Sequence, residues 1–194
     1  MKAGYIISAI GFFLSSFYFN VSGIRILPPF IGLLIFVLGL SKIRNFYSSS
    51  NSRVASIILK INALVSCLGG VVSLSKYSAD TPLAGILPLL PYIYILSNIL
   101  SVVCILFFFI QASEYFSKYS TLAPMWKSVR VVVPTVYAVC RLIYAVGDII
   151  PMGNYFSFIS VACPFVDLFV ITFMLIAAYS DHTAVAKEES RTDK

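Results

Sequence analysis

Charged residues are scarce in this chain: they make up 11% of its 194 residues, whereas globular domains carry about 25%. Hydrophobic residues make up 59%, and the mean hydropathy is +0.93. A soluble domain could not hide so much apolar surface, because even a domain of about 150 residues leaves nearly a third of its unfolded surface exposed. The composition therefore excludes a soluble domain, a disordered tail and a disulfide-stapled secreted module, and it predicts a polytopic membrane protein.

Histidine and cysteine are also rare. The single histidine, His182, lies in the polar C-terminal segment, which argues against haem bound by paired histidines and against a di-metal hydrolase within the membrane. Each of the four cysteines falls within an apolar run without C-x-x-C spacing: Cys67, Cys104, Cys140 and Cys163. This distribution is typical of buried thiols rather than of disulfides or zinc ligands. The sequence therefore predicts neither a cofactor nor a metal site.

Signatures of catalysis are missing as well. The chain has no D-x-x-D phosphotransferase motif, no glycine-rich phosphate loop and no G-x-S-x-G. Asp148 and Asp167 are 19 residues apart on different apolar runs, so they do not form a recognisable carboxylate pair. Cys140 adjoins Arg141, but neighbouring helical residues point about 100° apart, so the cysteine reads as an inert buried thiol. We therefore expect that the protein is not an enzyme.

What the chain does contain is long apolar runs. Six of them approach the roughly 20 residues that a helix needs to cross about 30 Å of hydrocarbon. They cover residues 4–19, 24–40, 54–74, 92–111, 131–150 and 155–179. The sequence thus predicts an all-α, polytopic integral membrane helical bundle with six transmembrane helices in a single domain over residues 1–180. A flexible polar cytoplasmic tail is expected over 181–194, and a proline-rich loop over 80–91.

The distribution of basic residues predicts the orientation, because Lys and Arg accumulate on the cytoplasmic side. With the N-terminus inside, the outer side receives only Arg25 and Lys76. The cytoplasmic side receives Lys2, Lys42, Arg44, Arg53, Lys118, Lys127, Arg130, Lys187, Arg191 and Lys194. We therefore expect both termini in the cytoplasm and the protein in the plasma (cell) membrane. Since the basic residues serve topology and form no patch interleaved with aromatics, no nucleic-acid partner is expected.

Three ionisable residues fall within apolar runs, where they are costly and usually point inward. Lys60 lies near the cytoplasmic end of its run, and its long stem can reach the headgroups. The turn is expected near Met152 or Gly153, with Arg141 about 12 residues before it and Asp167 about 14 after it. At 1.5 Å per residue, an antiparallel hairpin places these two within about 5 Å of the same depth. Because an unpaired charge in an apolar run is costly, we expect Arg141 and Asp167 to form an ion pair.

Further polar residues share helical faces with this pair. The candidate ligand-binding residues are Arg141, Asp167, Tyr137, Tyr144, Asp148, Asn98, Ser101 and Ser160. In one interpretation they surround a mid-membrane polar pocket on the third to sixth spans that binds or transports a small solute, with an anionic solute as the leading case. In the other interpretation, these residues form interhelical hydrogen bonds that contribute about 0.6 kcal/mol each to helix packing. The protein is then a non-catalytic accessory or assembly subunit of a membrane complex.

The gross plan offers one comparison. Six spans in 21.4 kDa, with both ends cytoplasmic, are similar to the membrane-embedded substrate-binding subunits of energy-coupling-factor vitamin importers. Those subunits often carry small residues spaced by four in the first span, as an A-x-x-x-A pattern, where a partner docks; the nearest match here is Gly4-x-x-x-Ser8, which departs from that pattern. The resemblance implies a substrate-binding subunit of a larger transporter. A membrane partner subunit on the small-residue faces of the first two spans, including Gly32 and Gly39, is therefore expected alongside the lipid bilayer.

Overall fold

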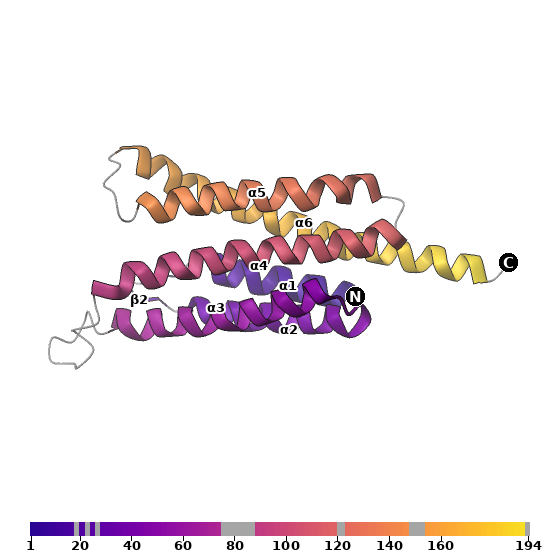
Figure 1. Ribbon diagram of the computed structural model, residues 1–194, viewed down its shortest axis with the longest axis horizontal. Coiled ribbons are helices and arrows are strands. Elements are labelled where there is room, and N and C mark those ends of the chain that lie inside the picture. The colour runs from indigo at the N-terminus through magenta and orange to yellow at the C-terminus, as the bar shows by residue number, and fades with distance from the viewer. Residues whose placement is uncertain are drawn as a thin grey trace.

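The computed structural model of the protein describes residues 1–17, 20–21, 24–25, 28–74, 88–119, 123–147 and 154–192. Nearly all of these residues lie in helices, which form a bundle, as the composition predicts (Figure 1). Its helices are α1 (Lys2–Ser16), α2 (Pro29–Phe46), α3 (Ser50–Leu74), α4 (Leu90–Tyr119), α5 (Ala123–Gly147) and α6 (Asn154–Thr192). The helix α6 continues through most of the segment predicted to be a polar tail. The start of α1 and the end of α6 lie at the same end of the bundle (Figure 1).

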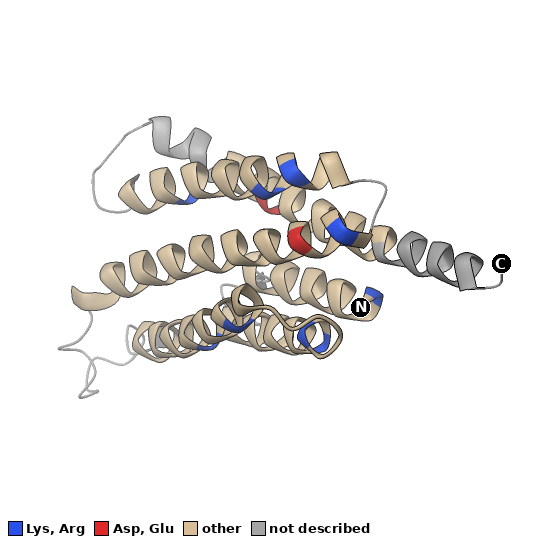
Figure 2. Ribbon diagram, turned by 45° about the vertical axis from the view of Figure 1, so that its right-hand side comes forward, with Lys and Arg blue, Asp and Glu red and all other residues tan. Residues whose placement is uncertain are grey.

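Five of these helices, α2 to α6, are long and apolar enough to cross a membrane. The helix α1 has 15 residues, which span about 22 Å and fall short of the roughly 30 Å hydrocarbon layer. Long stretches of each helix carry no charged residue (Figure 2). The chain is therefore a multi-pass integral membrane protein built as a helical bundle.

The outer surface of the bundle is apolar. On α3, large exposed side chains recur every three or four residues along one face, and these are Ile57, Ile61, Leu64, Leu68 and Val71. Lys60 is exposed beside them. An apolar stripe of this length suits contact with lipid rather than with water. Polar side chains such as Ser8, Asn62 and Gln111 are buried instead.

The second helix begins later than predicted, and the reason is local. The apolar run starts near Ile24, but α2 begins only at Pro29, and Pro28 lies in extended conformation before it. Proline lacks an N–H and restricts the residue before it, so it fits the first turn of a helix and not the interior. The residues ahead form two short antiparallel strands, β1 (Asn20–Val21) and β2 (Ile24–Arg25). The predicted span over 24–40 was therefore wrong at its start.

The helices form a closed ring. Each helix packs against the next along the chain, and α6 packs against α1, while α4 also touches α6. Successive helices run in opposite directions (Figure 1). A ring of this kind has an interior that several helices share, so residues far apart in the sequence can face one another.

The closest approach in the ring is between α1 and α2, and it depends on glycine. A Cβ built on Gly11 would collide with the backbone of Phe36, and one on Gly32 would collide with the backbone of Ser15. A Cβ on Gly39 would lie 2.5 Å from the amide nitrogen of Ser8. The small residues of the first two helices thus pack against each other within the chain, as small residues do between membrane helices.

Aromatic side chains fill the interior from mid-bundle toward the end where α1 begins. We call this group, Tyr5, Phe36, Phe108, Phe116 and Trp126, the aromatic plug; each member is almost fully buried. The ring of Tyr5 on α1 lies 5.9 Å from that of Phe108 and 5.8 Å from that of Phe116, both on α4. Trp126 stacks on Phe116 at 4.6 Å. Since α1 and α4 are not neighbours in the ring, these contacts cross its centre and close it.

Candidate functional site

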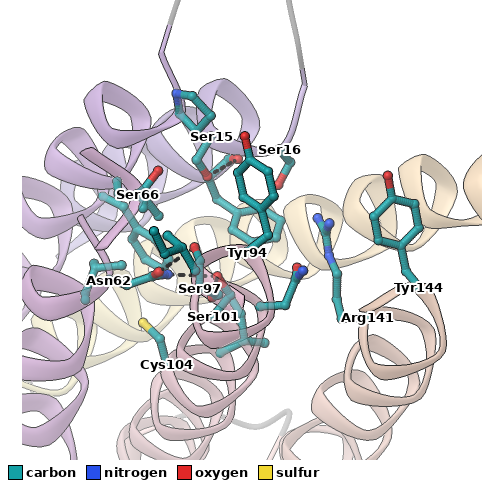
Figure 3. Close-up of a pocket in the computed structure, with 18 of the residues that line it drawn as sticks. Ser15, Ser16, Asn62, Ser66, Tyr94, Ser97, Ser101, Cys104, Arg141 and Tyr144 are labelled. Atoms are coloured by element: carbon teal, nitrogen blue, oxygen red, sulfur yellow. Dashed lines mark hydrogen bonds between the residues drawn. The ribbon is translucent and has the colours of Figure 1, made fainter. Parts of the chain in front are cut away.

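The other half of the ring is hollow. A cavity of about 510 Å³ extends from the helix ends at Ser16, Pro29 and Gly70 down to Leu59 and Tyr137 in mid-bundle. It is lined by α1 to α5, and Phe36 of the aromatic plug forms part of its wall. Figure 3 shows its polar side chains entering from several helices. The cavity therefore ends where the aromatic plug begins.

One wall of the cavity, from α3 and α4, carries a hydrogen-bonded polar layer. The Asn62 side chain is fully buried and donates from Nδ2 to the hydroxyl of Ser101 at 2.8 Å. The Ser97 hydroxyl donates to Oδ1 of Asn62 at 2.7 Å, and the Ser101 hydroxyl donates to the Ser97 carbonyl at 2.9 Å. These bonds are drawn in Figure 3. The layer is neutral and joins α3 to α4 at the depth of the cavity floor.

The α5 wall carries an arginine. Nη2 of Arg141 lies 2.7 Å from both Oδ1 and Oδ2 of Asp167, so the expected ion pair is present. The Arg141 side chain is 15% exposed and that of Asp167 is 4% exposed. The guanidinium carbon of Arg141 lies 5.3 Å from the ring centroid of Tyr137, within the range of a cation–π contact. Arg141 lines the cavity, whereas Asp167 on α6 is not part of its lining.

The structure places most of the predicted site residues together. Five of them line the cavity: Arg141, Tyr137, Tyr144, Asn98 and Ser101. Arg141 and Tyr144 project from α5, and Figure 3 shows them beside each other. Asp148 lies outside the described residues. Ser160 lies on α6 in a segment whose side chains the structure does not describe.

The cavity differs from the predicted pocket in the helices that build it. The sequence placed it on the third to sixth spans, but α1 and α2 line it too, and no described side chain of α6 does. The closed ring of helices explains why α1 and α2 line the cavity. Because α6 packs against α1, one face of α1 and one face of α2 point into the interior that the helices share. The rings of Phe12 on α1 and Tyr137 on α5, 5.8 Å apart, show this contact across the interior.

Sequence reasoning missed the contribution of α1. Ser15 and Ser16 line the cavity at the end of that helix. Two adjacent serines inside an apolar run are a weak polar signal, which could have singled them out but could not have paired them with α5. Ser97, Ser66 and Tyr94 also line the cavity; Tyr94 lies one turn before Asn98, and Ser97 directly before it.

The chemistry of the described lining is simple. It has one charged group, Arg141, together with hydroxyls and the side-chain amides of Asn62 and Asn98, and no carboxylate. Within the described part of the chain, no group of three or more metal-binding side chains occurs. The arrangement can donate charge-assisted hydrogen bonds to an anionic group and neutral ones to the rest of a small molecule.

Comparison with protein-family models, with curated proteins and with solved structures finds no match to this chain. Function is therefore inferred from the side chains of the cavity.

Proposed function

We propose that this protein binds a small solute with one anionic group in the cavity, as a transport protein or as the substrate-binding subunit of a larger transporter. The observation that supports the proposal is that Arg141 is the one charged residue in the described cavity lining. A guanidinium in a protein wall binds carboxylate or phosphate oxygens with charge-assisted hydrogen bonds, which are about twice as strong as neutral ones.

Asp167 has a specific part in this proposal. A lone guanidinium within the membrane would cost several kcal/mol or more, and the carboxylate of Asp167 at 2.7 Å compensates that charge when the cavity is empty. Because Asp167 lies behind Arg141 and not in the cavity, the arginine can face an incoming anion while it keeps this partner. The ion pair would thus hold Arg141 in place for the solute.

The opposite wall suits the rest of the solute. Ser97, Ser101 and Asn62 form a neutral polar layer, and Ser66 and Tyr94 extend it toward the helix ends. The volume of about 510 Å³ lies within the roughly 300–1,000 Å³ of small-molecule sites. The best fit is a compact molecule with a carboxylate at one end and hydrogen-bonding groups at the other.

The aromatic plug implies that the cavity communicates with one side of the membrane at a time. Transport would then require the plug to open while the cavity closes. No nucleotide-binding motif occurs in the sequence, so active transport would use a separate ATPase subunit or an ion gradient. The proposal places the protein in the cell membrane, which fractionation of native membranes would test.

Ligand binding tests the proposal. The probes are short aliphatic and aromatic monocarboxylates with their matching primary amides, and the readout is the melting temperature of the detergent-purified protein, followed by Kd measurement for each hit. We expect carboxylates to stabilise the protein more than their amides. The R141Q variant should bind the carboxylate about ten- to a hundredfold more weakly, since a hydrogen bond to a charged group contributes about 1.5–3 kcal/mol.

The matched control is R130Q, because Arg130 is exposed on the same helix and does not line the cavity. It should bind like the unaltered protein. Because R141Q leaves Asp167 unpaired, the R141Q/D167N double variant, which removes both charges, is measured beside it. The proposal is wrong if acids and amides stabilise the protein equally, or if R130Q loses as much affinity as R141Q.

Mild-detergent purification from native membranes separates this proposal from an accessory role. A co-purifying ATPase or a retained anionic metabolite supports solute binding. A co-purifying enzyme or secretion complex without a small molecule favours the accessory subunit, in which the polar residues serve helix packing.

A further inference from the structure

Two cysteines from neighbouring helices meet outside the cavity lining. The Sγ atoms of Cys140 on α5 and Cys163 on α6 lie 2.9 Å apart. Cys163 Sγ also lies 3.9 Å from the backbone oxygen of Cys140. The contact differs from that of Cys104, whose Sγ lies 3.9 Å from the carbonyl oxygen of Ala55 and not next to a second thiol. Hairpin spacing puts the two cysteines at a similar depth, 12 residues before and 11 after Met152, but it does not show that their side chains face each other.

The geometry is that of a thiol pair ready to be oxidised. In a disulfide the sulfurs are about 2.05 Å apart, so the two atoms need to approach by less than about 1 Å. A rotation of the two side chains can bring sulfur atoms closer by a distance of this size. Both cysteines are reduced here.

We propose that Cys140 and Cys163 are a redox modification site, at which a peroxide converts the two thiols into a disulfide that joins α5 to α6. The Cys140 thiol, which is the more exposed of the two, takes one oxygen from hydrogen peroxide to become a sulfenic acid, and one water is released. The sulfur of Cys163 then attacks that sulfenic sulfur, its proton leaves with the hydroxyl as a second water, and the S–S bond forms. Two thiols and one peroxide thus give one disulfide and two waters.

The position of this bond connects it to the ion pair. Arg141 follows Cys140 directly, and Asp167 lies four residues, about one helical turn, after Cys163. A disulfide here would fix the register of α5 against α6 at the depth where Arg141 meets Asp167. Any effect on solute binding rests on the proposed function, but the cross-link itself does not.

Mass spectrometry of the oxidised protein tests the proposal. Cleavage after Lys and Arg places each cysteine in its own peptide: Cys67 in 61–76, Cys104 in 77–118, Cys140 in 131–141 and Cys163 in 142–187. The full chain in membranes is treated with hydrogen peroxide, denatured, alkylated with a maleimide and digested. We expect peptides 131–141 and 142–187 to be joined, with a loss of about 2 Da from two hydrogens, and peptides 61–76 and 77–118 to be alkylated.

Dithiothreitol should separate the joined peptides, and the protein should run as a monomer on a non-reducing gel, because the bond is within one chain. The C67S variant is the matched control and should give the same product, whereas C163S should give none. The proposal is overturned if Cys140 reaches the sulfinic acid while Cys163 stays alkylatable, or if the joined peptides come from two chains. These outcomes do not depend on whether a solute binds to the cavity.

Discussion

Nη2 of Arg141 reaches both carboxylate oxygens of Asp167 at 2.7 Å, and these two side chains join α5 to α6. The two side chains of this ion pair have different surroundings. Arg141 lines the cavity, while Asp167 is almost fully buried behind it. A solute in the cavity would therefore meet the cation first, and the neighbouring helix would supply the charge that balances it.

The pair makes a specific prediction for stability. Arg141→Leu or Asp167→Leu alone should destabilise the protein by about 3–5 kcal/mol, because each leaves one buried charge without its partner. The double replacement should cost much less than the sum of the two, since no orphan charge remains. Unfolding of each variant by denaturant in mixed micelles measures the three values. Additive losses would mean that the contact contributes no coupling energy.

Glycine packing between α1 and α2 gives a second prediction. Gly11→Ala should destabilise the protein by about 1–3 kcal/mol or more, because its Cβ would collide with the backbone of Phe36. Gly70→Ala is the control, since a Cβ there has no neighbour within 4 Å. Its helix should gain up to about 1 kcal/mol from the better propensity of alanine. Melting temperatures compare the two, and an equal response at both positions would contradict the tight α1–α2 contact.

The aromatic plug gives a third prediction. Phe116→Ala should cost about 3–5 kcal/mol, because the ring is fully buried between Tyr5 and Trp126 and its loss leaves a cavity. Phe46→Ala is the control, since that ring is 74% exposed. Thermal unfolding in detergent is the measurement. If both variants lose the same stability, the interior at this end is not packed as described.

Orientation in the membrane remains a prediction from the basic residues, and thiol labelling tests it. In a chain whose native cysteines are replaced by serine, Ser48→Cys lies between α2 and α3, and Leu89→Cys lies just before α4; both positions are exposed. A membrane-impermeant maleimide added to intact cells should label only the Leu89→Cys variant. After permeabilisation it should label both. Labelling of Ser48→Cys in intact cells would reverse the predicted orientation and the side on which the cavity lies.

Composition and periodicity were sufficient for the class of the fold. An apolar fraction of 59% with few charges leaves helices in lipid as the stable solution, because a membrane-spanning backbone must satisfy its own hydrogen bonds. The depth of Arg141 and Asp167 could also be calculated, since helical rise is constant and a hairpin pairs residues at equal distance from its turn. Helix ends were less predictable: hydropathy continues through Ile24–Leu27, but the prolines at 28 and 29 delay α2.

The sequence by itself determined that this chain spans membranes, which polar residues are costly there, and that Arg141 and Asp167 lie at a similar depth. Only the tertiary structure decided that α1 and α2 close a ring with the other helices, that aromatic rings fill one half of it, and that the other half is a cavity. Likewise, only packing brought Cys140 to Cys163 and Phe12 to Tyr137. The physical reason is that periodicity fixes the face on which a residue lies along its own helix, whereas its neighbours across the bundle depend on how all six helices pack.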